Sequence, residues 1–156
     1  MAGRFRAAVD GGSRGNPGLA AWGVAVLDRD GRCVEGHAGT LGHATNNVAE
    51  YQGLLEALKC AEAARADDVE IRADAELIVR QIEGRYKVRN SGLIPLHAEA
   101  KRRIARFRSF RIVHIPRAEN READRLVNLA LDRAAEAGTG ETVKVLVVPD
   151  LSAGEA

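Results

Sequence analysis

The sequence predicts an α/β fold in which one five-stranded mixed sheet is flanked by helices. Near the N-terminus, three apolar runs follow one another with only turn residues between them, which indicates an antiparallel meander. Further along, apolar runs alternate with segments of helical spacing, which indicates parallel strands joined by right-handed crossovers. The chain has 156 residues, of which 46% are hydrophobic and 29% charged, and this balance is typical of one globular domain.

The first three strands are predicted from short apolar runs and the turn residues that bound them. Residues 5–9 form the first run, and Asp10 with the two glycines after it indicates that this strand ends there and enters a loop. Residues 20–27 and 33–39 form the second and third runs, and the Asp-Arg-Asp-Gly segment between them favours a hairpin.

Helix and strand patterns then alternate through residue 134. Thr45 and the two asparagines after it supply N-cap chemistry, and Tyr51, Leu54 and Leu58 follow with helical spacing. An irregular basic segment at 84–91 separates two later helices. The later elements are predicted as a strand at 69–73, helices at 75–82 and 93–105, a strand at 110–115, and a last helix that Asn120 could cap.

The chain is expected to divide into a domain at residues 1–138 and a C-terminal tail at 139–156. Five of the six residues at 143–148 are apolar, which is more than a solvated tail usually carries. The tail could add an extra strand to a sheet edge, or it could contact a second chain. The sequence therefore predicts a monomer or a dimer joined through the tail, with no obligate protein partner evident.

Composition narrows the class of protein further. No run of about 18 apolar residues exists and no apolar segment follows the first arginines, so neither a membrane span nor a secretory signal is expected. The two cysteines are too few for a disulfide framework, which favours reduced thiols in a cytoplasmic protein. The net charge is +1, but residues 85–125 hold twelve basic and four acidic residues and could contact phosphates.

Four carboxylates fall at the ends or in the first turns of predicted elements, where ligand-binding groups collect in α/β sheets. They are Asp10, Glu50, Asp74 and Asp124. Each has an ordinary explanation when it is taken alone. An Asx-turn would account for Asp10 and Asp74, and the helix dipole favours Glu50 and Asp124 in any protein.

The surroundings of these acids make a functional site the better interpretation. Residues 10–18 hold four glycines, a proline, Ser13 and Asn16, and glycines allow a backbone to approach a ligand closely. With residues 45–51, an aliphatic strand ending in Asp74, and residues 119–124, they form four motifs in a specific order. On these motifs the sequence resembles type 1 ribonuclease H over roughly residues 5–134, in a short form that lacks the family's basic protrusion.

The resemblance implies a ribonuclease H-like fold and an endonuclease that cleaves the RNA strand of RNA–DNA hybrids. It would leave 3′-hydroxyl and 5′-phosphate ends with little base-sequence specificity. The resemblance also makes the four acids catalytic metal ligands, with Asp10 bridging two ions. Unit charges 4 Å apart repel by about 4 kcal/mol at an effective dielectric of 20, so converging carboxylates require protons or cations. All-oxygen ligands suit Mg²⁺, with Mn²⁺ as a substitute.

The resemblance also implies a set of contacts with the hybrid duplex. Asn16, Asn46 and Asn47 would line the minor groove, where amides can test for a 2′-hydroxyl, and Thr45 would hold a phosphate of the DNA strand. Turn and cap formation is the alternative explanation for these asparagines. The other residues predicted to bind substrate are Gly11, Ser13, Glu76, Arg85, Lys87 and Arg89.

The sequence departs from the family at three points. Residues 84–93 are too short for the helix and basic protrusion of longer members, and Glu76 stands where many members have glutamine. His114 is the only candidate for the family's loop histidine, but it falls within a predicted strand, which favours a structural role. Arg117 or Arg121 could then assist product release. A transferase of the same fold and a non-catalytic nucleic-acid-binding module are the rival functions, and the presence of all four acids argues against the second.

Overall fold

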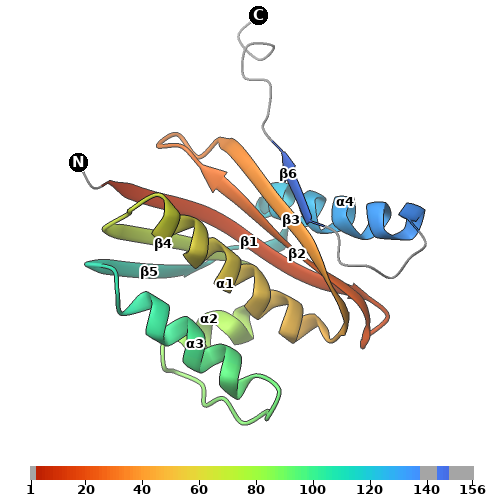
Figure 1. Cartoon of the computed structure of the whole chain (residues 1–156). Coiled ribbons are helices and arrows are strands. Elements are labelled where there is room, and N and C mark those ends of the chain that lie inside the picture. Colours follow the sequence, from red (N-terminus) through yellow and green to blue (C-terminus); the bar gives the residue numbers. More distant parts are fainter. Residues whose placement is uncertain (1–2, 138–143, 148–156) are drawn as a thin grey trace, which may run out of the picture.

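The computed structural model describes residues 3–137 and 144–147, which form one mixed sheet with helices on both faces (Figure 1). The strands lie in the order β5-β4-β1-β2-β3-β6. Strands β1, β4 and β5 are parallel, whereas β1, β2, β3 and β6 pair antiparallel. The strands are β1 (Arg4–Arg14), β2 (Gly18–Leu27), β3 (Cys33–Ala44), β4 (Asp68–Ala73), β5 (Ser109–His114) and β6 (Lys144–Val147). The predicted mixed α/β sheet is confirmed, with six strands instead of five.

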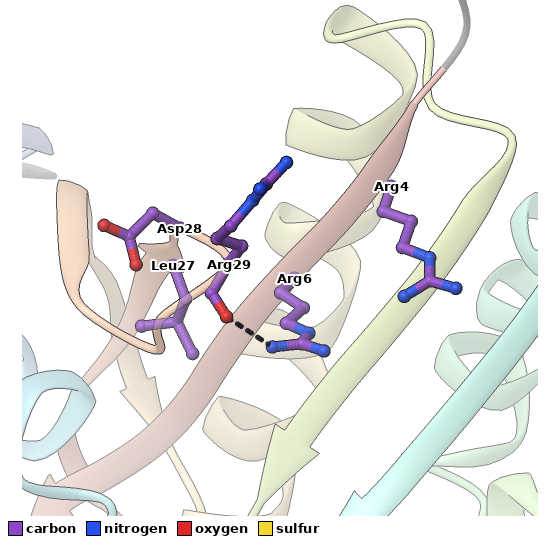
Figure 2. A pocket seen from close by; sticks show the side chains of 5 residues that line it. All are labelled: Arg4, Arg6, Leu27, Asp28 and Arg29. Atoms are coloured by element: carbon purple, nitrogen blue, oxygen red, sulfur yellow. Dashed lines mark hydrogen bonds between the residues drawn. The ribbon is translucent and has the colours of Figure 1, made fainter.

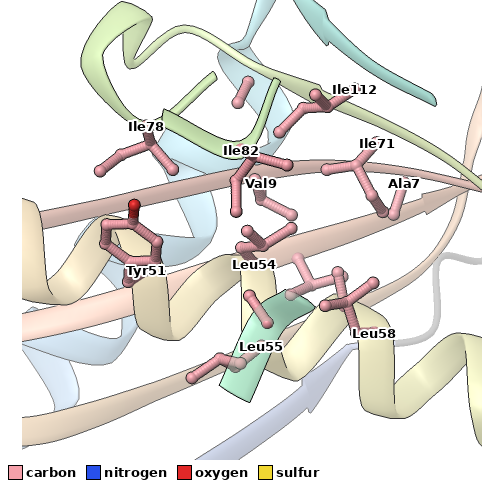
Figure 3. Packing of buried hydrophobic residues seen from close by; sticks show 14 of the residues in the cluster. Ala7, Val9, Tyr51, Leu54, Leu55, Leu58, Ile71, Ile78, Ile82 and Ile112 are labelled. Carbon is pink, nitrogen blue, oxygen red and sulfur yellow. The ribbon is translucent and has the colours of Figure 1, made fainter. Parts of the chain in front are cut away.

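Helices cover the two faces of the sheet unequally. The first core cluster packs α1, α2 and α3 against one face, with large side chains such as Leu54, Ile71 and Ile82 (Figure 3). The second core cluster packs α4 against the other face and is rich in alanine. The helices are α1 (Asn46–Ala63), α2 (Glu76–Ile82), α3 (Ile94–Ile104) and α4 (Arg121–Ala137), and a 3-10 turn, η1 (Arg117–Glu119), precedes the last of them. No helix in the described ranges is long and apolar enough to cross a membrane.

Strand β1 does not end where the sequence predicted. Asp10 and the glycines after it remain in the strand, because β2 continues to pair with them as far as Arg14 opposite Leu19. The chain reverses instead between the two strands, where Gly15 has a φ of +87° that favours glycine. The predicted loop was therefore placed about five residues too early, and Asp10 lies inside a strand.

The two parallel neighbours β1 and β4 end at different points. Strand β4 ends at Ala73, which is paired with Val9, whereas β1 continues for five more residues. From Asp10 onward, β1 therefore lacks its parallel partner on that side. This step in the sheet leaves an opening next to Asp10 that side chains from neighbouring elements can reach.

Strand β6 adds an edge to the sheet. Residues Lys144–Val147 pair antiparallel with β3, with Gly36 opposite Val147 and Gly39 opposite Lys144. Val145 and Val147 pack against the second core cluster. An extra edge strand was one of the two alternatives that the sequence offered for the tail, and these four residues form it. The rest of the predicted tail lies outside the described residues.

Deleting residues 144–156 should lower the melting temperature by roughly 2–8 °C. Losing the two partly buried valines costs roughly 1–2 kcal/mol, and each kcal/mol shifts the melting temperature of a domain of this size by about 2–4 °C. A thermal melt followed by circular dichroism measures the shift. Deleting only residues 148–156 keeps β6 and should have a much smaller effect, and equal melts for all three chains would contradict a stabilising role for β6.

Candidate active site

Three of the four predicted acids meet at the step between β1 and β4. Asp10 lies in β1, Glu50 in α1, and Asp74 directly after β4. One carboxylate oxygen from each lies within 4.8 Å of the corresponding oxygens of the other two. The structure therefore brings together acids that are 40 and 64 positions apart in the sequence from Asp10. Such a set can hold a cation through oxygen ligands.

Two glycines allow α1 to bring Glu50 to this position. A Cβ on Gly11 would lie 2.2 Å from the backbone carbon of Ala49, and a Cβ on Gly53 would lie 2.8 Å from the backbone oxygen of Asp10. Neither distance is compatible with a side chain, so the helix and the strand approach each other backbone to backbone. Gly11 was predicted to bind substrate, and in the structure its lack of a side chain permits this close approach of α1 and β1.

Asp124 lies in the same hollow but outside the tight group of three. The hollow has a volume of about 430 Å³, and Asp124 lines it from the start of α4, on the opposite face of the sheet from α1. Its charge contributes to raising the pKa of Asp10. The four predicted acids therefore share one hollow, with ligands supplied by both helical layers and by the sheet.

Burial and mutual repulsion hold protons on this cluster. Burial, followed by the charge of Asp74, raises the pKa of Asp10 to about 7, although the Gly11 N–H donates to its carboxylate at 2.9 Å. Burial and the charges of Asp10 and Asp74 raise the pKa of Glu50 well above its usual range. The cluster therefore cannot carry its full negative charge near neutral pH unless cations compensate it.

Asn120 is a site residue whose role the sequence did not reveal. It was predicted to cap the last helix, and its backbone oxygen does accept the Asp124 N–H at 3.2 Å. Its side chain, however, is only 1% exposed and donates from Nδ2 to the Val9 oxygen at 2.8 Å and to Asp74 Oδ1 at 3.4 Å. The amide thus enters the acidic site instead of capping the helix. The one feature of the sequence that could have indicated a role in the site is the position of Asn120, four residues before Asp124.

The polar residues near the start of α1 are joined to the glycine-rich hairpin. Asn46 Oδ1 accepts hydrogen bonds from both N and Oγ of Ser13 at 2.9 Å, and the Asn46 N–H donates to Asn16 Oδ1 at 3.1 Å. Thr45 Oγ1 accepts from the Val48 N–H at 3.2 Å and caps the helix as predicted. Gly11, Ser13 and Asn46 line the acidic hollow. Their turn and cap roles are therefore real, and they leave some donors free to act on a ligand.

The other residues predicted to bind substrate are exposed and do not line the acidic hollow. Asn47 is in the first turn of α1, and Glu76 begins α2. Arg85, Lys87 and Arg89 lie between α2 and α3, where Lys87 lines a separate hollow of about 360 Å³. Their contacts with substrate stay predictions.

His114 and the two arginines near it take different positions. His114 is exposed and is the last residue of β5, as the strand pattern predicted. Arg117, in η1, lines the acidic hollow. Arg121 begins α4 and is exposed. Of the two arginines suggested by the sequence, Arg117 is therefore the one that lines the acidic hollow.

A larger hollow, of about 530 Å³, lies near the start of β1 (Figure 2). It is lined by three arginines together with Leu27 and Asp28, and Arg6 donates to the backbone oxygen of Arg29 at 3.4 Å. Asp28 accepts hydrogen bonds from two backbone N–H groups of its own turn. One engaged carboxylate among three guanidinium groups does not suit a cation, so the smaller acidic hollow is the candidate active site.

The sheet order and the shared acidic hollow define an α/β protein of the ribonuclease H-like fold. Comparison with known proteins agrees, because residues 8–130 match the family described as "Reverse transcriptase-like". The crystal structure of RNase H1 from the halophilic archaeon Halobacterium salinarum matches with a TM-score of 0.81 and 42% identity, covering 85% of this chain and 100% of that one. The chain belongs to the ribonuclease H family.

Two further structures extend this comparison. The N-terminal RNase H domain of Rv2228c from Mycobacterium tuberculosis matches with a TM-score of 0.82 and 38% identity, covering 88% of this chain and 100% of that one. LC11-RNase H1 in complex with an RNA/DNA hybrid matches with a TM-score of 0.79 and 39% identity, covering 84% of this chain and 99% of that one. The chain spans 66% of the full-length Halobacterium salinarum Ribonuclease HI and 39% of the bifunctional protein Rv2228c.

Proposed function

We propose that this protein is an endonuclease that hydrolyses the RNA strand of RNA–DNA hybrids. Its products would be 3′-hydroxyl and 5′-phosphate ends, with little dependence on base sequence. The convergence of Asp10, Glu50 and Asp74 within 4.8 Å, in a hollow that Asp124 also lines, carries the proposal. The hybrid complex of LC11-RNase H1, at 39% identity, supports the choice of substrate. It would act in the cytoplasm, as a monomer or as a dimer joined through its C-terminal tail.

Two Mg²⁺ ions are the proposed cofactors, and Mn²⁺ should replace them. The donor set fits such ions, because it is made of carboxylate oxygens, and burial together with neighbouring carboxylates raises the pKa of Asp10 and of Glu50. Asp10 would contact both ions, with Glu50 and Asp74 completing one site and Asp124 the other. When bound, the ions would activate a water and neutralise charge on the scissile phosphate and its 3′ leaving oxygen.

The residues around the acids would select and hold the hybrid. The Oδ1 atoms of Asn46 and Asn16 are occupied by Ser13 and by the Asn46 N–H, so the amides would offer NH₂ donors to a ligand. Such donors suit the 2′-oxygen of a ribose. Arg117 in the hollow would pair with a phosphate, and Arg85, Lys87 and Arg89 would follow the duplex backbone.

One assay tests the proposed function against its rivals. End-labelled RNA–DNA hybrid, RNA duplex and DNA duplex are each incubated with Mg²⁺, Mn²⁺ or a chelator. We expect cleavage of the hybrid's RNA strand with either cation, no cleavage with chelator, and 3′-hydroxyl product ends. Tight binding of the hybrid without cleavage would identify a binding module, and equal cleavage of the DNA duplex would identify a nuclease of another specificity.

Replacing His114 with alanine should reduce turnover of the hybrid by less than about tenfold, or roughly 1.4 kcal/mol. His114 is exposed at the end of β5 and does not line the acidic hollow, whereas Arg117 does. Steady-state kinetics on the hybrid measure the change, with Arg117→Ala expected to have the larger effect. A loss far above tenfold in folded His114→Ala protein would assign the histidine to catalysis.

A further inference from the structure

The side chain of Asn120 combines deep burial with an incomplete set of hydrogen bonds. It is 1% exposed, and its Oδ1 has no hydrogen-bond partner among the described residues. A buried acceptor without a partner lowers the stability of a folded protein and calls for an explanation. An apolar residue in the same place would avoid this cost. The hydrogen bonds that its NH₂ group donates must therefore explain why an amide occupies this position.

The NH₂ group links β1, which carries Asp10, to Asp74, which directly follows β4. It donates to the Val9 oxygen at 2.8 Å and to Asp74 Oδ1 at 3.4 Å. Val9 immediately precedes Asp10 and is paired with Ala73, which immediately precedes Asp74. The amide therefore joins β1 to Asp74 at the place where the β1–β4 ladder ends and backbone pairing no longer fixes the separation of the two acids.

The same residue also fixes the start of α4. The backbone oxygen of Asn120 accepts the N–H of Asp124 at 3.2 Å, in the first turn of the helix that carries this acid. Asn120 is thus bonded to Asp74 and Asp124 directly, and to the residue next to Asp10. An amide suits the side-chain position, because its NH₂ group carries two hydrogens on one nitrogen, one for each acceptor.

We propose that Asn120 is a positioning residue that holds Asp74 in place relative to Asp10 and thereby sets the affinity of the acidic hollow for divalent cations. The proposal rests on the proposed function only in requiring that the hollow bind such cations. Asn120→Asp has nearly the same shape but replaces the donor NH₂ with an acceptor that repels Asp74. The bridge is therefore lost without creating a cavity.

Titration with Mn²⁺ alone, followed by calorimetry, tests the proposal without any substrate. We expect Asn120→Asp to weaken Mn²⁺ binding at least about tenfold relative to the unmodified protein. In cleavage assays, kcat should fall at a fixed low Mn²⁺ concentration and recover as Mn²⁺ is raised, with the KM for the hybrid nearly unchanged. Loss of folding stability alone would not produce this rescue by cation.

Gln81→Glu is the matched control, because Gln81 is also a buried amide, 4% exposed, but bonds to the Tyr51 hydroxyl at 2.6 Å in the first core cluster. It should lower the melting temperature while leaving Mn²⁺ affinity unchanged. Should Asn120→Asp fail to fold, Asn120→Ser is measured in the same way. Unchanged Mn²⁺ affinity in a folded Asn120 variant would overturn the proposal. Asn120-dependent Mn²⁺ binding without hybrid cleavage would support it and overturn the proposed function instead.

Discussion

Replacing Asp10 with asparagine is expected to abolish hybrid cleavage while the protein remains folded. Asp10 is at the centre of the acidic group and is proposed to contact both cations, so its loss should weaken both sites. We expect kcat/KM to fall at least about a thousandfold, which corresponds to about 4 kcal/mol of transition-state stabilisation. Asp30→Asn, in the exposed turn between β2 and β3, is the control and should retain activity. Turnover by Asp10→Asn at a normal rate would refute the proposed role of Asp10.

The same substitution should raise stability in the absence of divalent cations, with a defined pH dependence. An unfolded aspartate titrates near pH 3.9, whereas burial and Asp74 raise the folded pKa of Asp10 to about 7. Ionisation of Asp10 therefore destabilises the unmodified protein progressively as the pH rises from about 4 to about 7. Urea denaturation at pH 4 and pH 8 should show Asp10→Asn gaining up to about 4 kcal/mol at the higher pH only. Added Mg²⁺ should close this gap by stabilising the unmodified protein.

Replacing Gly11 with alanine is expected to cause a large loss of folding stability. The new Cβ would lie 2.2 Å from the Ala49 carbon, 2.3 Å from its oxygen and 2.4 Å from the Glu50 nitrogen. All three are backbone atoms, so no rotamer change relieves the contact and α1 must move away from β1. We expect a loss of about 3 kcal/mol or more, at the upper end of overpacking effects. Denaturant unfolding measures it, and cleavage should also fall because Glu50 moves with the helix.

Gly12→Ala is the matched control for this prediction. Gly12 is the next residue in the same strand, and its added Cβ would meet only the Val127 side chain, at 3.8 Å, which is ordinary contact. We expect its free energy of unfolding to change by less than about 1 kcal/mol. Similar losses for the two variants would show that strand propensity, and not the approach of α1, determines the need for glycine at position 11.

The order of the elements and the meeting of the acids could be predicted from the sequence. Both depend on hydrophobic spacing and motif order, which can be read directly along the chain. Apolar runs and helical spacing located nearly every element, and right-handed crossovers placed Asp74 beside Asp10. The end of β1 was wrong because a Gly-Gly pair is usually a loop signal. Here Gly11 serves the approach of a helix from another part of the chain, which no local pattern records.

The role of Asn120 in the site likewise could not be predicted from local sequence, because it depends on distant parts of the chain. An asparagine before a helix predicts a cap, and the side chain could have turned either way. It enters the interior because Val9 in β1 and Asp74, directly after β4, present two oxygen acceptors there. The positions of these acceptors are a property of the assembled sheet. The order of the motifs was sufficient to identify the acids, but the residue that connects them required coordinates.

The step at which β4 ends while β1 continues has a consequence for cooperativity. Because the acids come from the sheet and from helices on both of its faces, cations bound there would connect the three layers through their ligands. Helix α4 packs against the sheet through the small, alanine-rich second core cluster. Occupancy of the hollow should therefore slow the local opening of α4, and amide hydrogen exchange along that helix would report the thermodynamic linkage between ligand and fold.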